Sequence, residues 1–295
     1  MPRPAPYDWP EGFRSAACFS VDVDAEAPYL WAHRAGLPQT LGQIEQRRFG
    51  PREGLWRILD MLDRVAMKGS FFVPAVTAEL HPDILPALVE AGHEIGLHGH
   101  LHELVAECPQ DAFEAALDHS LAVFDAQTGR RPAGFRSPAW EMTPAMLAAL
   151  RARGIAYDSS LSGFDHPYEI DGLTEMPVQW QIDDAVYFRF FGGGADNWPP
   201  ARAADVGGSW HDEFAAGRAH GQCFMMTVHP WISGRAQRLE MLERLLTDIA
   251  AASDVWCAAV AEVAAWHAAS VNAGRHAVAA DLEALARPLT SKDRP

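Results

Sequence analysis

The stretch ACFSVDVD, residues 17–24, is an apolar run that ends in two aspartates. A segment with apolar residues at helical spacing follows at 55–62, and a second apolar run, SFFV, at 70–73. A strand, a helix and another strand in this order form a βαβ unit, whose two strands lie parallel in one sheet. The beginning of the chain therefore predicts an α/β fold.

The same alternation continues almost to the end of the chain and amounts to about seven strand-helix repeats. This pattern is typical of a parallel sheet or barrel. No internal repeat and no linker divides the chain, so we expect a single domain. The expected helices are 82–91, 111–127, 143–153, 210–219, 237–251 and 260–269, and the further strands are 94–97, 134–136, 155–157, 223–228 and 254–257.

Between residues 159 and 200 the alternation breaks into a Gly- and Asp-rich region, which we interpret as a long loop insertion. Two runs inside it, 176–181 and 186–191, have the composition of strands. The expected organisation is an N-terminal arm, a barrel and a C-terminal arm, with limits at 1–16, 17–270 and 271–295.

Composition and charge exclude several classes of protein. The chain has 39 acidic against 24 basic residues, and a formal charge of −15 repels nucleic acid and anionic membrane surfaces. The four cysteines are widely spaced, so neither a disulfide framework nor a thiolate zinc site is indicated. The N-terminus lacks the apolar run of a secretory signal, and no window is apolar enough for a membrane span. We expect a cytoplasmic protein.

Asp22 and Asp24 stand at the end of the first strand, where they alternate with Val21 and Val23. Two-residue periodicity sends both carboxylates to one side of the strand and both valines to the other. A surface strand has the same pattern, but the carboxyl edge of a parallel sheet is where α/β enzymes place their sites. The two aspartates are therefore candidate site residues.

The stretch GHEIGLHGHLHE, residues 92–103, contains four histidines. In an extended strand His98 and His102 would lie about 13 Å apart, too far for one ion with bonds of about 2 Å. In a helical turn the rise between them is only about 6 Å. A metal site thus requires the strand to end near His98 and turn at Gly99, with His100 pointing elsewhere. The alternative is a solvated, His-rich loop. With Asp24, the two histidines make a set that suits zinc or another divalent metal.

Two further motifs lie at strand ends. His229 ends the apolar strand 223–228 and precedes a proline. In GFRSPAWE, residues 134–141, Arg136 could hold a carboxylate and Trp140 could wall a pocket. Taken singly, a packed histidine, a surface arginine and a core tryptophan are the simpler interpretations. Five of the ten tryptophans stand beside acids, prolines or strand ends and suggest an aromatic pocket or a subunit interface, namely Trp31, Trp140, Trp180, Trp198 and Trp231.

With these four elements in this order, the chain resembles the polysaccharide deacetylase (NodB-homology) superfamily over about 17–266. The resemblance implies a distorted (β/α)7 barrel that hydrolyses C–N amide bonds at one metal ion. It further implies that Asp22 is the catalytic base, that the metal ligands are Asp24, His98 and His102, and that His229 is the general acid.

The sequence departs from the secreted members of that superfamily. Their two aspartates are adjacent, whereas Val23 separates these, and Ala139 replaces the usual aromatic of the third motif. Both departures resemble an intracellular branch of peptidoglycan-deacetylase-like proteins, allantoinases and cyclic imide hydrolases, commonly homotetramers. The segments 98–103, 175–184 and 229–235 agree with that branch. Its allantoinases lack the histidine pair, so His98 and His102 favour a metal-dependent relative.

The expected function is hydrolysis of a small soluble amide, a cyclic imide or related ring amide, with one divalent metal ion, zinc, as cofactor. Arg136 supports Asp22, and Asp183 or Asp184 orients His229 or lines the pocket. The alternatives are an N-deacetylase of an N-acetyl sugar or peptidoglycan-type substrate, an allantoinase, a metal-dependent isomerase and a non-catalytic metal-binding scaffold. A small-molecule substrate and further copies of the chain in a tetramer are the expected partners.

Overall fold

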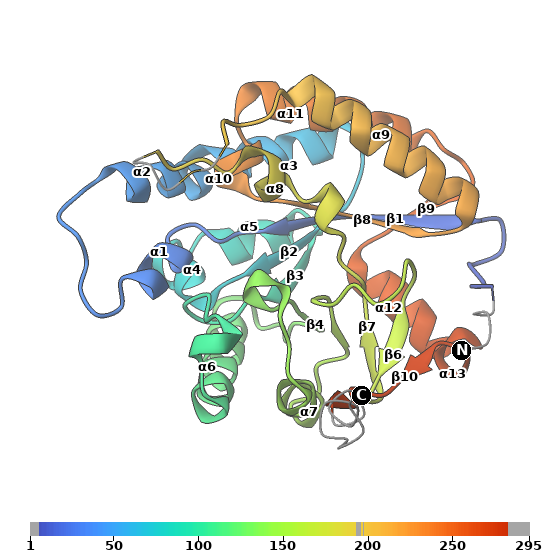
Figure 1. Cartoon of the computed structure of the whole chain (residues 1–295), viewed down its shortest axis with the longest axis horizontal. Coiled ribbons are helices and arrows are strands. Elements are labelled where there is room, and N and C mark those ends of the chain that lie inside the picture. The colour runs from blue at the N-terminus through green and yellow to red at the C-terminus, as the bar shows by residue number, and fades with distance from the viewer. Residues whose placement is uncertain (1–5, 193–195, 197, 283–295) are drawn as a thin grey trace, which may run out of the picture.

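The computed structural model describes residues 6–192, 196 and 198–282. The strands of this part of the chain form one curled sheet in the order β10-β6-β7-β5-β4-β3-β2-β1-β8, with β9 beside β1. Helices lie around the outside of the curl, with α9 beside β8 and β1, and α5 beside β3 (Figure 1). The strands are β1 (Ser15–Asp22), β2 (Ser70–Val73), β3 (Glu94–Leu97), β4 (Gly134–Phe135), β5 (Tyr157–Asp158), β6 (Tyr168–Ile170), β7 (Leu173–Glu175), β8 (Cys223–Val228), β9 (Val255–Cys257) and β10 (Ala277–Val278).

The α-helices follow the strands along the chain. They are α1 (Ala27–Ala32), α2 (Gly42–Phe49), α3 (Leu55–Arg64), α4 (Ala75–Leu80), α5 (Ile84–Glu90), α6 (Gln110–Thr128), α7 (Pro144–Ala152), α8 (Asp184–Phe188), α9 (Ala203–His220), α10 (Pro230–Ser233), α11 (Ala236–Ala250), α12 (Val260–Ala269) and α13 (Asn272–Arg275). Short turns of other helix types are η1 (Gly50–Gly54, a π-helix), η2 (Val105–Glu107), η3 (Pro138–Trp140) and η4 (Trp180–Ile182). No helix of the described ranges is long and apolar enough to cross a membrane.

Every strand pair is parallel except the β6–β7 hairpin. A parallel bridge between Asp183 and Thr227 joins the segment after β7 to β8, and this contact curls the two ends of the parallel sheet toward each other. The result is a single α/β domain with a half-barrel sheet, which confirms the predicted fold class.

β1 is buried on both faces, and its alternate residues belong to two different cores. Phe19 and Val21 pack into the large core between the sheet and the outer helices. Ala16 and Cys18 pack into a smaller core inside the curl. Because side chains alternate along a strand, Asp22 points the same way as Ala16 and Cys18. The carboxylate of Asp22 therefore faces the barrel interior and not solvent.

The loop insertion folds differently from the prediction. The strands expected at 176–181 and 186–191 are wrong: the hairpin of this region is β6–β7, and 184–188 is the helix α8. The Asp183 carboxylate accepts a hydrogen bond from the Ala185 amide (2.6 Å) and so starts a helix in an apolar run of strand-like composition. Residues 176–181 run beside β8, where the Gln179 side chain, not a backbone ladder, binds the Met225 amide.

The sheet also extends past the expected limits of the barrel. β1 begins at Ser15, and Tyr7 stacks on His267 of α12 with ring centroids 5.9 Å apart. Beyond residue 270, β10 pairs with β6. Part of each expected arm is thus packed onto the barrel, while 1–5 and 283–295 lie outside the described residues.

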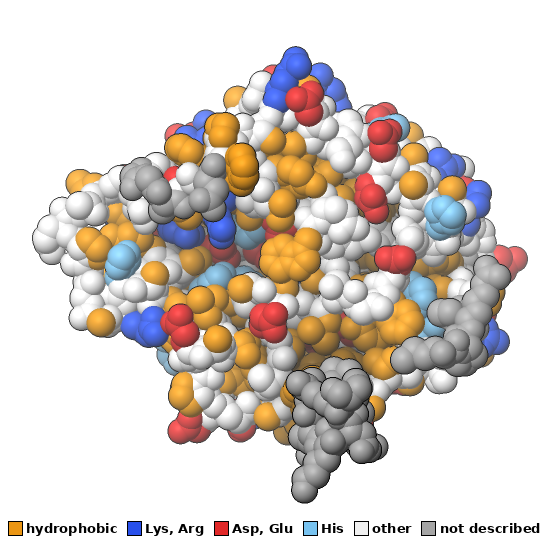
Figure 2. Space-filling model, viewed as in Figure 1, with side chains coloured by type: hydrophobic (Ala, Val, Ile, Leu, Met, Phe, Trp, Pro, Cys, Tyr) orange, Lys and Arg blue, Asp and Glu red, His pale blue; other side chains and the backbone are white. Residues whose placement is uncertain are grey.

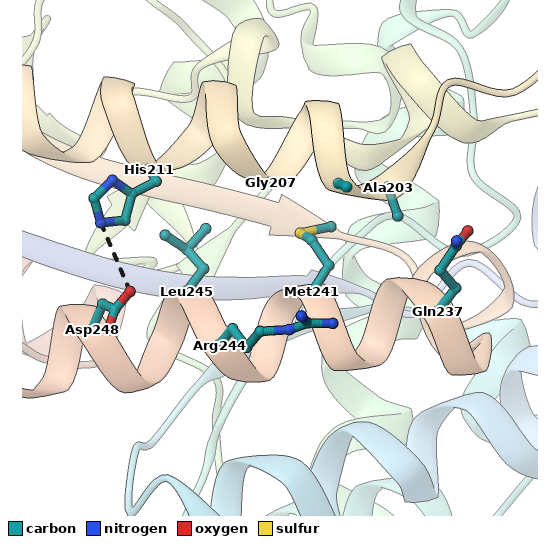
Figure 3. Close-up of a pocket in the computed structure, with 9 residues that line it drawn as sticks. Ala203, Gly207, His211, Gln237, Met241, Arg244, Leu245 and Asp248 are labelled. Carbon is teal, nitrogen blue, oxygen red and sulfur yellow. Dashed lines mark ion pairs between the residues drawn. The ribbon is translucent and has the colours of Figure 1, made fainter.

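Two glycines let the chain after β8 pack directly onto η1. A Cβ on Gly54 would lie 2.1 Å from the Pro230 carbonyl oxygen, and one on Gly234 would lie 2.3 Å from the Gly54 Cα. A similar close approach joins α9 to α11, where a Cβ on Gly207 would lie 2.6 Å from Met241 Cγ (Figure 3). The η1 contact holds α10, and with it His229, against the rest of the barrel.

We expect Gly54→Ala to destabilise the protein by about 1–3 kcal/mol, because the added methyl group must displace backbone and not a flexible side chain. Thermal unfolding measures the loss. Gly208→Ala on α9 is the matched control, since its Cβ would meet nothing within 4 Å and alanine favours a helix over glycine. Equal melting temperatures for Gly54→Ala and the wild type would contradict the close contact.

Two carboxyl groups are buried next to each other on the paired strands β5 and β7. Asp158 and Glu175 are fully buried neighbours on β5 and β7, and Glu175 Oε1 accepts hydrogen bonds from the amides of Ser160 and Leu161. Burial raises the pKa of Asp158 to about 6, and burial together with Asp158 raises the pKa of Glu175. The folded protein therefore holds a proton here that the unfolded chain releases.

A carboxyl group whose pKa is raised by folding stabilises the fold at low pH, and this contribution is lost as pH rises through the folded pKa. We expect Glu175→Gln to stabilise the protein more at pH 8 than at pH 5, by about 1.4 kcal/mol for each pH unit over which the extra proton is held. Melting temperatures across this pH range measure the difference. A pH-independent effect would show that the pair does not share a proton.

Candidate functional site

The carboxyl ends of β1, β3, β4 and β8 meet at one edge of the sheet and surround a pocket of about 160 Å³. Figure 2 shows the hollow near the middle of the molecular face, where acidic, histidine and basic side chains gather. Every candidate site residue from the sequence either lines this pocket or contacts a residue that lines it. The lining residues are Asp22, Asp24, Pro28, Arg47, His98, His102, Ala139, Trp140, Trp180, Asp183, Ala185, Arg189, His229, Trp231 and Ile232.

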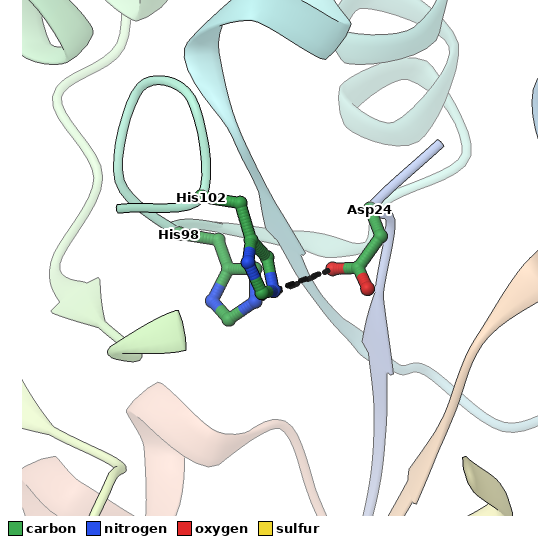
Figure 4. Close-up of side chains that lie close together, drawn as sticks. All are labelled: Asp24, His98 and His102. Atoms are coloured by element: carbon green, nitrogen blue, oxygen red, sulfur yellow. Dashed lines mark ion pairs between the residues drawn. The ribbon is translucent and has the colours of Figure 1, made fainter. Parts of the chain in front are cut away.

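Asp24, His98 and His102 converge on one point of this pocket (Figure 4). Asp24 Oδ1 lies 3.4 Å from His98 Nε2 and 3.6 Å from His102 Nε2. This buried oxygen has no hydrogen-bond partner within the described ranges. Ligands of a tetrahedral ion with bonds of about 2.0–2.1 Å lie about 3.3 Å apart. The three side chains and the unsatisfied oxygen therefore fit a divalent metal ion.

The turn after β3 brings the two histidines together. β3 ends at Leu97, and the backbone then adopts left-handed conformations at Gly99 (φ 70°) and His102 (φ 62°). Glu103 closes the turn, because its carboxylate accepts hydrogen bonds from the amides of His100 and Leu101. The turn is not the helical one that the spacing suggested. Its tighter path places the two imidazole centroids 5.1 Å apart.

Hydrogen bonding and charge prepare the ligand atoms for a cation. His98 Nδ1 lies 2.8 Å from the Arg136 carbonyl oxygen, which only an N–H can approach, so Nε2 carries the free lone pair. Burial lowers the pKa of His98, but Asp22 and Asp24 raise it above its usual value. Burial lowers the pKa of His102 to about 4, which leaves its imidazole neutral. Burial raises the pKa of Asp24, yet His102, His98 and His229 outweigh it and keep this carboxylate ionised.

Asp22 is held by the fully buried Arg136, whose Nη1 donates to Asp22 Oδ1 over 2.8 Å. The same nitrogen contacts the hydroxyl groups of Ser20 and Thr227 at 2.8 and 3.3 Å. Arg136 also lies over the Phe72 ring, 4.1 Å from its centroid. A charged residue this deep is tolerated only when it is paired and hydrogen-bonded. Asp22 is thus fixed in the same pocket as the candidate metal ligands Asp24, His98 and His102.

His229 is oriented by Asp184. The sequence leaves open whether Asp183 or Asp184 contacts this histidine. His229 Nδ1 donates to Asp184 Oδ1 over 2.7 Å, and Asp184 Oδ2 accepts from the His229 amide and the Ser233 hydroxyl. His229 Nε2 then faces the pocket, 3.7 Å from Asp24 Oδ2. Burial lowers the pKa of His229, but Asp184 and Asp24 raise it to about 10. Asp183 lines the pocket instead, and burial raises its pKa to about 7.

A second cluster of possible metal ligands, Asp183, Asp184 and His229, is not a metal centre. The ligand atoms of Asp183, Asp184 and His229 lie close enough to share an ion. Both oxygens of Asp184 are, however, already occupied by hydrogen bonds from His229 and Ser233. His100 likewise stands outside the site, because its Nε2 contacts Glu79 at 3.2 Å and its ring lies against His119.

Three of the five tryptophans singled out in the sequence line the pocket. Trp140 and Trp180 stand together as one wall, with ring centroids 4.2 Å apart, and Trp231 lies on another side. Trp198 is 81% exposed, and Trp31 borders a different hollow. The aromatic pocket was therefore predicted correctly in part.

Sequence analysis missed two cations of the pocket, Arg47 and Arg189. Arg47 belongs to α2 and Arg189 follows α8. Neither stands at a strand end or in a motif, and Arg47 is one of two consecutive arginines in a polar helix, so no local signal distinguishes it from a surface residue.

Comparison with known proteins agrees with this geometry. A family model, Polysaccharide deacetylase, matches residues 49–157, which include His98, His102 and Arg136. Peptidoglycan deacetylase from Helicobacter pylori is 27% identical over 261 residues, which cover 78% of this chain and 88% of that protein. The crystal structure of the PuuE allantoinase has a TM-score of 0.76 at 22% identity over 88% of this chain and 93% of that one, a likeness of fold alone.

A crystal structure from Mycobacterium smegmatis, provisionally named a polysaccharide deacetylase, superimposes with a TM-score of 0.85. It is 35% identical to this protein and covers 89% of this chain and 93% of its own. Identity at this level over nearly the whole of both chains does not arise from a shared fold alone. The protein belongs to the polysaccharide deacetylase family of hydrolases.

Proposed function

We propose that this protein is a metal-dependent hydrolase that cleaves a C–N bond of a small amide, a cyclic imide or related ring amide. One observation carries the proposal: the partnerless Asp24 oxygen and two imidazole Nε2 atoms face one point, between a fixed carboxylate and an oriented imidazole. The pocket volume of about 160 Å³ supports a small substrate, because sites for drug-sized ligands are typically about 300–1,000 Å³.

In this proposal Asp24, His98 and His102 hold the metal ion, and their carboxylate and imidazole donors suit zinc. Such an ion, when bound, polarises a substrate carbonyl and lowers the pKa of water from about 16 toward 7. The resemblance of the chain to metal-dependent deacetylases supports this assignment.

Asp22 serves as the general base. It lines the pocket beside the ligands, and Arg136 fixes its Oδ1, so its carboxylate is placed to accept the proton of an attacking water. Neither partner can turn away, because Arg136 is also bound to Ser20, Ser159 and Thr227. A base held in this way needs no reorganisation when it takes the proton from the attacking water.

His229 serves as the general acid. Asp184 fixes its Nδ1, and its Nε2 faces the pocket 3.7 Å from Asp24 Oδ2, where it can protonate the leaving nitrogen. An amide nitrogen leaves poorly without a proton, and a positioned acid of this kind contributes about 10²–10⁴-fold in rate. Asp184 acts through His229 as a positioning residue.

N-deacetylation of an N-acetyl sugar or peptidoglycan-type substrate is the second candidate. It is favoured by the relative from Helicobacter pylori, which bears the name peptidoglycan deacetylase. The same residues could cleave an acetamide. The wall made by Trp140 and Trp180 and the small pocket favour the smaller substrate.

We expect the purified protein to hydrolyse at least one of succinimide, hydantoin and allantoin faster than N-acetylglucosamine. Product formation, measured with protein of known metal content, tests the expectation. Hydrolysis of the N-acetyl sugar alone would assign the protein to the N-deacetylases, and no hydrolysis with intact metal would favour the isomerase or scaffold alternatives.

Asp24→Ala and His98→Ala are expected to purify without the metal, because each removes one of three protein ligands. Elemental analysis of the purified variants measures the metal-to-protein ratio. His100→Ala is the matched control, since this histidine lies on the same turn but contacts Glu79, and it should keep the wild-type ratio. Wild-type metal content in His98→Ala would mean that the ion is held elsewhere.

Asp22→Asn is expected to retain the metal and to lose about 10²–10⁴-fold in kcat, because an amide cannot accept the proton. Turnover on the best substrate, together with elemental analysis, separates this effect from loss of the ion. Normal turnover in Asp22→Asn would refute the assignment of the base.

A further inference from the structure

Arg47 is a cation of the pocket that forms no ion pair with the residues the structure describes. Its Nη1 is buried and has no hydrogen-bond partner in the part of the chain that the structure describes. The guanidinium carbon lies 5.0 Å from the ring centroids of both Phe191 and Trp231, so its surroundings on that side are apolar. Arg48 and Arg52, by contrast, are paired with Glu45. Arg47 alone of these three lines the pocket.

A buried guanidinium nitrogen without a partner is costly, because its lost hydration is not replaced by a hydrogen bond. Burial lowers the pKa of Arg47 to about 10, although Asp24 opposes this, so the group stays charged at neutral pH. Arg189 lines the same pocket and repels Arg47, since its charge also lowers the Arg47 pKa. Two positive charges therefore line the same pocket. An anion between them would replace the lost hydration of Arg47 and would screen the repulsion between Arg47 and Arg189.

The remaining charges of the pocket do not supply that anion. Asp22 is neutralised by Arg136 at 2.8 Å. Asp24 faces the two imidazoles and would be a ligand of the metal. Asp183 is buried and has a pKa raised to about 7, so it is only partly ionised at neutral pH. A pocket that would also hold a divalent cation is thus locally positive in a chain whose formal charge is −15.

We propose that Arg47 and Arg189 form an anion subsite for the substrate, which is a small amide or imide carrying a carboxylate. The proposal rests on the proposed function and names its substrate class. A guanidinium presents parallel N–H donors that match the two oxygens of a carboxylate. The subsite fixes the carboxylate while the amide carbonyl lies toward Asp24, His98 and His102 within the same 160 Å³.

The substrate test compares a neutral ring amide with its carboxylate analogue, hydantoin and hydantoin-5-acetate. We expect the metal-loaded wild type to have the higher kcat/KM on hydantoin-5-acetate. Arg47→Met should lower the ratio of kcat/KM on hydantoin-5-acetate to kcat/KM on hydantoin by about 10–100-fold. The change should arise mainly from a higher KM for hydantoin-5-acetate, because the substitution removes a charge-assisted hydrogen bond to the substrate. Arg47→Lys should recover part of the loss. Arg52→Met is the matched control, since it deletes the same charge from a residue outside the pocket.

A second test measures anion binding independently of catalytic turnover. Calorimetry on the metal-loaded protein compares malonate with acetate, since malonate offers a second carboxylate to the arginines. The wild type is expected to prefer malonate by about 10-fold or more, and Arg47→Met should lose the preference. This preference without hydrolysis of either hydantoin, of succinimide, of allantoin or of N-acetylglucosamine would leave the subsite in place and overturn the proposed function.

Three results would overturn the subsite. One is an unchanged ratio of kcat/KM in Arg47→Met, and another is an equal malonate preference in both proteins. The third is an equal loss of kcat on the neutral and the anionic substrate with unchanged KM, which would place Arg47 at the reacting carbonyl instead.

Discussion

The buried guanidinium of Arg136 is the interaction on which the rest of the site depends. Its nitrogens bind Asp22 and Ser20 of β1, Thr227 of β8 and Ser159 after β5, and its carbonyl oxygen accepts the Nδ1–H of His98. One residue therefore joins the proposed base Asp22, the proposed metal ligand His98, the strands β1 and β8, and the segment after β5. Because an unpaired charge in this interior would be very costly, the curl of the sheet and the geometry of the site stabilise each other.

The residues around the pocket divide into satisfied and unsatisfied groups. Arg136, Asp184 and Glu103 each make two or more hydrogen bonds and hold their neighbours in place. Asp24 Oδ1 and Arg47 Nη1 are buried and lack partners among the described residues. Satisfied groups are structural supports, whereas buried polar atoms without partners are where a ligand contributes most. This contrast is the basis on which we propose a cation beside Asp24 and an anion beside Arg47.

Much of the fold could be predicted from the sequence, because the periodicity of regular strands and helices is local. Prediction failed at 186–191, where the capping carboxylate of Asp183 turns an apolar run into a helix. At the two ends of the chain, Tyr7 and β10 pack onto the barrel through contacts that are distant in sequence. The site was partly foreseeable: the motif residues stand at strand ends, but Arg47 and Arg189 come from segments without any chemical signal.

The sequence by itself determined the α/β alternation, the positions of Asp22, Asp24, His98 and His229 at strand ends and of His102 in the turn that follows His98, and the resemblance to a hydrolase family, since spacing and residue type express all of these. Only the tertiary structure decided that Asp22 faces inward, that Asp184 and not Asp183 orients His229, and that two arginines enter the pocket. The reason is physical: strand periodicity is a property of neighbours in the chain, whereas burial and pairing of charge depend on segments that meet only when the sheet curls.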